Sequence, residues 1–141
     1  MLQVKKNYFE QNRLLLFTLE GEITDPQMAG DELNTPDVAF ESDCLQEIVD
    51  CRRLEVAESV DPEDLVDFAK KILSWRDCEM LLLIPADSPL HQGMAVAFPS
   101  VIAKKRRRIW LHYTVDEAIN LLNLIQINSP VKAIMQLKAV G

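Results

Sequence analysis

The chain has 141 residues, 48% of them hydrophobic, which is the size and composition of one compact domain with a single core. Its formal net charge of −7 argues against nonspecific attraction to nucleic acid or to an anionic membrane surface. No apolar run is long enough to cross a bilayer and residues 1–13 contain no apolar signal core, so we expect a cytoplasmic protein without an integral membrane segment.

The N-terminal residues predict a β-hairpin followed by a short helix. Strand-favouring residues occupy 5–10 and 14–22, and a polar turn separates them. Asp25 then precedes a proline at the first helical position, so a helix is predicted from there towards Leu33, although Gly30 weakens it.

The stretch 44–73 predicts the βα unit of a parallel sheet. An apolar strand over 45–50 ends in Asp50, a charged loop follows, and Asp61 caps a helix that has Pro62 in its first turn. The apolar residues of this helix recur at helical spacing and predict a face covered by the sheet: Leu65, Phe68, Ala69 and Ile72.

The next predicted elements are a central strand and a third helix. Residues 79–84 form a continuous apolar run, the pattern of a strand with both faces buried. Ser88 precedes a proline and predicts a helix through Val101, with Pro99 as a kink or an early end.

The C-terminal part predicts a last strand, a fourth helix and an apolar extension. The strand covers 109–113, and a capping box at 114–117 opens the helix. Residues 125–141 carry few charges, so we expect them to pack on the domain formed by residues 1–124 or on a second subunit in a homodimer. The predicted fold class is α/β, with a mixed, mostly parallel five-stranded sheet, an N-terminal hairpin and about four helices.

This order of elements resembles the SpoIIAA-like (STAS-like) superfamily of small cytoplasmic domains, typified by anti-sigma-factor antagonists and including many uncharacterised bacterial proteins. The resemblance covers roughly residues 8–124 and lies in four segments: LEGEITD at 19–25, FESDCLQEIVD at 40–50, VDPEDL at 60–65 and YTVDEAINLL at 113–122. It implies a right-handed βα superhelix. In the antagonists a phosphorylatable serine begins the helix after the strand that ends here in Asp50, but this chain has Asp61-Pro62-Glu63 there, which indicates a non-phosphoswitching branch.

Ligands of open α/β sheets bind at the carboxyl ends of the strands, so this edge is the predicted site. We expect it to gather Asp50, Cys51, Arg52, Arg53, Ser59, Asp87, Ser88, His91, Tyr113 and Thr114. The ligand- or partner-binding candidates among them are Asp50, Arg52, Arg53, Ser59, Asp87, Ser88 and His91. The acids at the predicted helix starts are best interpreted as caps and dipole partners, and they disfavour phosphate binding.

The same edge suggests two reactive groups, each with a simpler interpretation. Asp87, Ser88 and His91 supply an orienting acid, a hydroxyl and a base, but Ser88 is already expected to cap a helix. Cys51 is either a low-pKa thiol beside Arg52 and Arg53 or a buried, inert cysteine. The three cysteines contain no CxxC pair and have no histidine at ligand spacing, so we expect no disulfide, metal or cofactor.

Five consecutive cations interrupt this acidic sequence: Lys104, Lys105, Arg106, Arg107 and Arg108. They form either a docking site for an acidic partner or a solvated end of the third helix, where cations favour the negative end of the dipole. No aromatic residue interleaves them, so no nucleic-acid partner is expected.

These observations favour a non-enzymatic regulatory or binding module that acts through protein contacts or through a small apolar ligand held beneath its helices. The alternative is a small enzyme that uses the carboxyl-edge cluster around Asp87, Ser88 and His91.

Overall fold

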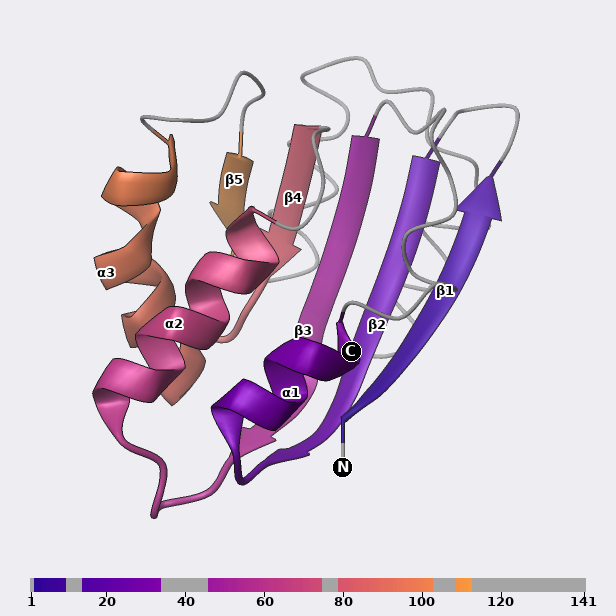
Figure 1. Cartoon of the computed structure of the whole chain (residues 1–141). Helices are drawn as coiled ribbons and strands as arrows, with labels where there is room; N and C mark the ends of the chain where they lie inside the picture. Colours follow the sequence, from indigo (N-terminus) through magenta and orange to yellow (C-terminus); the bar gives the residue numbers. More distant parts are fainter. Residues whose placement is uncertain (1, 10–13, 34–45, 75–78, 103–108, 113–141) are drawn as a thin grey trace.

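The computed structural model describes residues 2–9, 14–33, 46–74, 79–102 and 109–112. These residues form β1 (Gln3–Phe9), β2 (Leu14–Ile23), α1 (Pro26–Glu32), β3 (Gln46–Val56), α2 (Pro62–Leu73), β4 (Glu79–Leu83), α3 (Pro89–Ile102) and β5 (Ile109–His112) (Figure 1). The sheet has the order β1-β2-β3-β4-β5, with β1 antiparallel to β2 and the other neighbours parallel. The predicted α/β class, the mixed, mostly parallel sheet and the N-terminal hairpin are confirmed.

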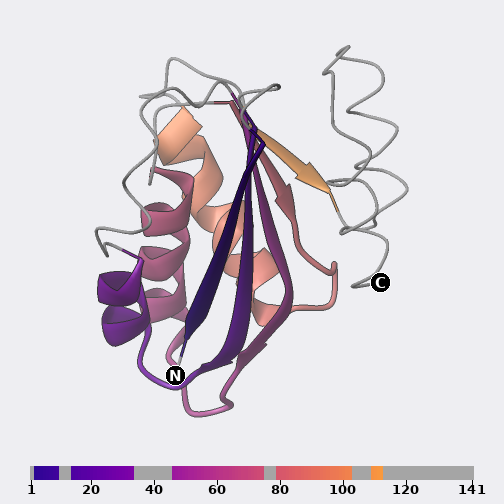
Figure 2. The ribbon, with the colours of Figure 1, turned by 90° about the vertical axis from the view of Figure 1, so that its right-hand side faces the viewer.

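The three described helices form one layer on one face of the sheet (Figures 1 and 2). Each parallel strand lies beside the strand that precedes it in the chain, so each connection advances across the sheet in the same direction. Right-handed βα crossovers that advance in one direction place all their helices on the same face.

The core between this helical layer and the sheet is built from alternate strand residues and from one stripe of each helix. Leu15 and Phe17 from β2 belong to it, and so do Phe68 and Ile72 from α2 and Met94 from α3. Each of these side chains is at most 1% exposed. The predicted apolar stripe of the second helix is therefore confirmed.

Other strand residues point to the opposite face of the sheet, which we call the second face. They alternate with the helix-side residues along the strands, lie outside the helix-side core, and are nevertheless buried: Leu14, Leu16, Ile48, Leu81 and Leu83. The prediction that β4 has two buried faces is confirmed.

The predicted helix starts are also confirmed. The Asp25 carboxylate accepts hydrogen bonds from the backbone N–H groups of Gln27 and Met28, at 3.1 and 3.3 Å. Asp61 accepts from the N–H of Glu63 at 3.1 Å. In each case the cap satisfies donors that the first helical turn leaves without a partner inside the helix.

The predicted end of the third strand at Asp50 is wrong, because β3 continues to Val56. β2 runs to Ile23 and supplies a hydrogen-bonding partner along this added length, and a register shift between Thr18 and Glu20 inserts one extra residue into β3. Cys51, Arg52 and Arg53 therefore lie within a strand and not in a loop.

The third helix also extends further than a break at Pro99 would allow, since α3 continues to Ile102. Pro99 lacks the N–H that would bind the carbonyl of Ala95, but both residues are exposed, so water can hydrate that carbonyl.

Several predictions fall outside the described residues: the fourth helix, the extension 125–141, the basic run 104–108, and the site candidates Tyr113 and Thr114. Among the helices that are described, none has the length and apolar character needed to span a membrane.

Candidate functional site

The structure places the seven site candidates in three separate segments of the chain and does not gather them all at the carboxyl edge of the sheet. Asp50, Arg52 and Arg53 lie within β3, Ser59 lies in the turn between β3 and α2, and the last three surround the start of α3. Ser59 is exposed, as expected for a loop residue.

Asp50 and Arg52 form a buried ion pair at the irregular part of β3. The Arg52 Nε donates to Asp50 Oδ1 at 3.0 Å and its Nη2 donates to Oδ2 at 2.9 Å, so the guanidinium grips the carboxylate with two parallel bonds. The backbone N–H of Arg52 also donates to Asp50 Oδ1, at 3.1 Å. The Asp50 side chain is 2% exposed and that of Arg52 is 12% exposed, so this pair is a structural unit of the second face.

Arg53 belongs to a different, exposed ion network that joins three strands. Its Nη1 lies 3.2 Å from Glu20 Oε2, and Lys5 Nζ lies 2.6 Å from Glu20 Oε1. Hydrogen bonds from Lys5 and from Arg53 lower the pKa of Glu20 below its usual value. The sequence did not reveal Glu20 as a member of this site. Glu20 is 15 positions from Lys5 and 33 positions from Arg53, and only the strand register brings the three side chains together.

Ser88 acts as the cap of α3. Its Oγ accepts a hydrogen bond from the backbone N–H of Leu90 at 3.2 Å, and its carbonyl accepts one from the N–H of His91 at 3.0 Å. Asp87 is exposed and His91 is partly buried. The predicted cap is confirmed: Asp87 directly precedes the cap Ser88, and His91 lies in the first turn of α3.

The hypothesis that Cys51 is a low-pKa thiol is wrong. Cys51 is 2% exposed and belongs to the core beneath the helices. Burial raises the pKa of its thiol, and the charge of Asp50 raises it further. The guanidinium groups of Arg52 and Arg53 are paired with the carboxylates of Asp50 and Glu20, respectively.

One buried charged residue was not predicted. Glu47 is 1% exposed, alternates in β3 with the second-face residue Ile48, and pairs in register with Leu15 of β2 and Met80 of β4. It is buried like Asp50, but on the helix side of the sheet. Its place within the predicted strand 45–50 was the sequence signal of this burial.

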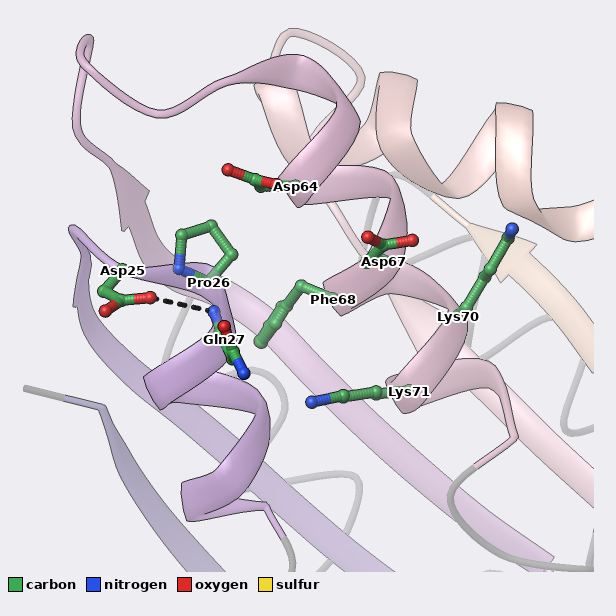
Figure 3. Close-up of a pocket in the computed structure, with 8 residues that line it drawn as sticks. All are labelled: Asp25, Pro26, Gln27, Asp64, Asp67, Phe68, Lys70 and Lys71. Atoms are coloured by element: carbon green, nitrogen blue, oxygen red, sulfur yellow. Dashed lines mark hydrogen bonds between the residues drawn. The ribbon is translucent and has the colours of Figure 1, made fainter.

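An open cavity of about 570 Å³ lies between α1 and α2 (Figure 3). Asp25, Pro26 and Gln27 line it from the start of α1, and Asp64, Asp67, Phe68, Lys70 and Lys71 line it from α2. Lys71 Nζ is 3.8 Å from Asp31 Oδ1, so one cation at its rim is already close to an acid. Charges of both signs make this cavity suited to a polar ligand, and it contains none of the seven site candidates.

A smaller cavity of about 160 Å³ lies beside α1, where Glu22, Asp25 and Glu32 contribute acidic side chains. These acids do not form a metal site, because the described part of the chain contains no group of three or more histidine, cysteine, aspartate or glutamate side chains placed to hold an ion.

No family model matches the sequence, and no curated protein matches it.

Proposed function

We propose that the protein is a non-enzymatic binding module of SpoIIAA-like (STAS-like) type that acts through protein contacts. The observation that carries this proposal is that the groups that could be reactive have structural roles instead. Asp50 is bound by Arg52, Ser88 caps α3, and the Cys51 thiol is buried with a raised pKa. The sequential strand order and the layer formed by the three described helices on one face of the sheet (Figure 2) support the βα superhelix that the resemblance implies.

The outer side of α3 supports protein contacts. The helix contains no aspartate, glutamate, lysine or arginine, and its Val96 side chain is 66% exposed. A solvent-facing helix side without charges is unusual, since exposed helix faces are normally charged or polar. By contrast, α2 exposes Glu63, Asp64, Asp67 and Lys70.

The same geometry favours a protein partner over the small apolar ligand. Side chains of the helix-side core such as Phe68, Ile72 and Met94 are at most 1% exposed, so the space beneath the described helices is filled. The larger cavity is lined mainly by charged residues, which offer little to an apolar molecule. The smaller cavity combines Leu2, Ile23 and Met28 with three acidic residues, and its volume of about 160 Å³ is below that of most ligand pockets.

The test is a matched pair of charge substitutions on the two helices. Partners captured from cell extract by the full chain are purified and rebound to Val96→Lys and to the control Glu63→Lys. Val96→Lys should weaken binding at least ten-fold without changing the unfolding transition, because it places a charge in an apolar contact. Binding that survives Val96→Lys unchanged, or the absence of any partner that rebinds in purified form, would refute the proposal.

The enzyme alternative makes a separate prediction about Ser88. A serine activated by His91 should react with a fluorophosphonate probe, and His91→Gln should abolish that reaction. We expect no labelling of Ser88. Ser88→Ala should cost about 1 kcal/mol of stability as a lost cap, while Ser88→Asp, which keeps an acceptor at that position, should restore it.

A further inference from the structure

The cavity between α1 and α2 separates acidic from basic side chains (Figure 3). Its volume of about 570 Å³ lies in the range of small-molecule sites. Asp64 and Asp67 line it on one side of Phe68, and Lys71 lines it on the other. The cavity therefore has a negative end and a positive end.

The dipole of α2 accounts for only part of this arrangement. Asp64 belongs to the first turn of the helix and Lys71 to the last, where the nearer end of the dipole favours each charge. Asp67 lies in the middle of the helix, where the dipole gives no such benefit. It precedes Lys71 by four residues, the spacing at which opposite charges on one helix pair.

Lys71 nevertheless turns towards α1 and not towards Asp67. Its Nζ is 3.8 Å from Asp31 Oδ1, and its aliphatic chain lies against Gly30, where a Cβ would come within 2.6 Å of Lys71 Cδ. The side chains of Lys71 and Asp31 are 40% and 72% exposed, so this pair is weak and Lys71 can exchange Asp31 for another carboxylate. Within the described part of the chain, Asp64 and Asp67 have no ion-pair partner.

The remaining walls of the cavity suit the uncharged part of a ligand. Pro26 and Phe68 are buried residues that contribute apolar surface, and the Gln27 amide contributes a donor and an acceptor. Asp25 caps α1 through the backbone N–H groups of its first turn, so this wall is held in place without a ligand.

We infer that this cavity binds a small zwitterion with an ammonium group and a carboxylate, the chemistry of a free amino acid or a dipeptide. Asp64 and Asp67 bind the ammonium group, and Lys71 binds the carboxylate. Asp67 and Lys71 are about 6 Å apart along the helix axis, a separation that a molecule of this size bridges. A simple cation or anion would meet a like charge at one end of the cavity, whereas a zwitterion complements both ends.

This inference goes beyond the proposed function, because the cavity lies between α1 and α2 and does not involve the outer side of α3. The test is isothermal titration calorimetry of the full chain with each standard amino acid and with glycylglycine. At least one of these probes should bind with a millimolar or lower Kd. Asp67→Asn and Lys71→Gln should each weaken that binding at least ten-fold. The matched control is Glu63→Gln, which removes a neighbouring exposed charge of α2 that does not line the cavity and should leave the Kd unchanged.

Analogues of the probe that binds assign the two ends of the cavity. N-acetylation removes the positive charge, so the acetylated form should bind weakly and should lose its sensitivity to Asp67→Asn. The amide of the carboxyl group should in the same way lose its sensitivity to Lys71→Gln. Binding of glycylglycine without binding of any amino acid would identify the ligand as a peptide.

Two results would overturn the inference. One is that no probe binds at millimolar concentration. The other is that Asp67→Asn and Lys71→Gln bind the probe as tightly as the parent protein does. Val96→Lys should leave binding of the probe unchanged, so the outcome is independent of the partner-binding test on α3.

Discussion

The two ions of the Asp50 and Arg52 pair differ from those of the neighbouring network in their access to water. A buried carboxylate that loses its cation keeps the cost of desolvation without the compensating attraction, whereas water screens an exposed pair. Arg52→Ala should therefore lower the free energy of unfolding by about 3 kcal/mol. Arg53→Ala, which removes a cation from the exposed Glu20 network, should cause a much smaller loss.

Urea denaturation of the two variants and the parent protein measures this difference directly. Equal losses in Arg52→Ala and Arg53→Ala would mean that the burial of the first pair has no energetic consequence. The comparison is matched, since both substitutions remove an arginine from β3 at adjacent positions.

Cys51 predicts a loss of stability at alkaline pH. Its pKa in the folded protein is raised above the ordinary value of 9.0, so the stability that the neutral thiol contributes is fully present below pH 9 and is lost as pH rises towards the folded pKa. Above pH 9 the loss should approach about 1.4 kcal/mol per pH unit.

The variant Cys51→Ala isolates this effect, because every other titrating group is the same in both proteins. The stability advantage of the parent over Cys51→Ala should shrink between pH 8 and pH 10.5 in urea titrations. A constant difference across this range would show that the thiol titrates equally in the folded and unfolded chains.

At the scale of elements, two helical glycines have opposite surroundings. A Cβ on Gly93 of α3 would lie 3.2 Å from the backbone oxygen of Leu65 in α2, whereas a Cβ on Gly30 of α1 would meet only the flexible end of Lys71. Alanine gains about 1 kcal/mol over glycine in a helix interior. Gly30→Ala should therefore be neutral or stabilising, since Lys71 can move away.

Gly93→Ala should destabilise the protein despite the same gain in helix propensity, because the α2 backbone cannot yield without separating two packed helices. Thermal unfolding of the two variants measures the sign of each effect. Stabilisation by Gly93→Ala would mean that α2 and α3 are not as closely packed as the distance to Leu65 requires.

Element types were predictable from the sequence where the signal is local. A cap followed by proline is contained in two adjacent residues, so the starts of α1, α2 and α3 were found correctly. The end of β3 was not found, because its continuation past Asp50 depends on pairing with a distant strand, β2. Gly21 in that part of β2 has a φ of 120°, a conformation that favours glycine. The sequence alone does not reveal that the backbone adopts this conformation at position 21.

The candidate site was less predictable than the elements for the same reason. Ser88 was identified with its role, since a cap binds a residue two positions away. The network of Lys5, Glu20 and Arg53 requires the register of three strands, and the cavity between α1 and α2 requires the packing of two helices. Neither the ion network nor the cavity can be predicted from the spacing of residues along the sequence.

At the scale of the whole molecule, the sequential strand order places β3 at the centre of the sheet and β1 at one edge, and the two strands differ in their burial and pairing. β3 is hydrogen-bonded to β2 and β4, and residues such as Val49 and Ile48 are buried on its two faces. Among the described strands β1 pairs with β2 alone, and it exposes Gln3, Lys5 and Asn7. Lysines on an edge strand discourage pairing with another chain.

This difference predicts the pattern of amide hydrogen exchange. Amides of β3 from Ile48 to Asp50 should exchange only through global unfolding, because exposing them requires both neighbouring strands and the helical layer to separate. Amides of β1 should exchange faster through local opening, since detaching that strand leaves the pairing of β2, β3 and β4 intact.

Hydrogen exchange followed by NMR, at a series of urea concentrations below the unfolding transition, separates the two mechanisms. Only exchange through global opening accelerates steeply as the urea concentration rises. If β1 amides matched those of β3 in rate and urea dependence, the hairpin would be an inseparable part of the folding unit, and the sheet would unfold as a single body from its edge to its centre.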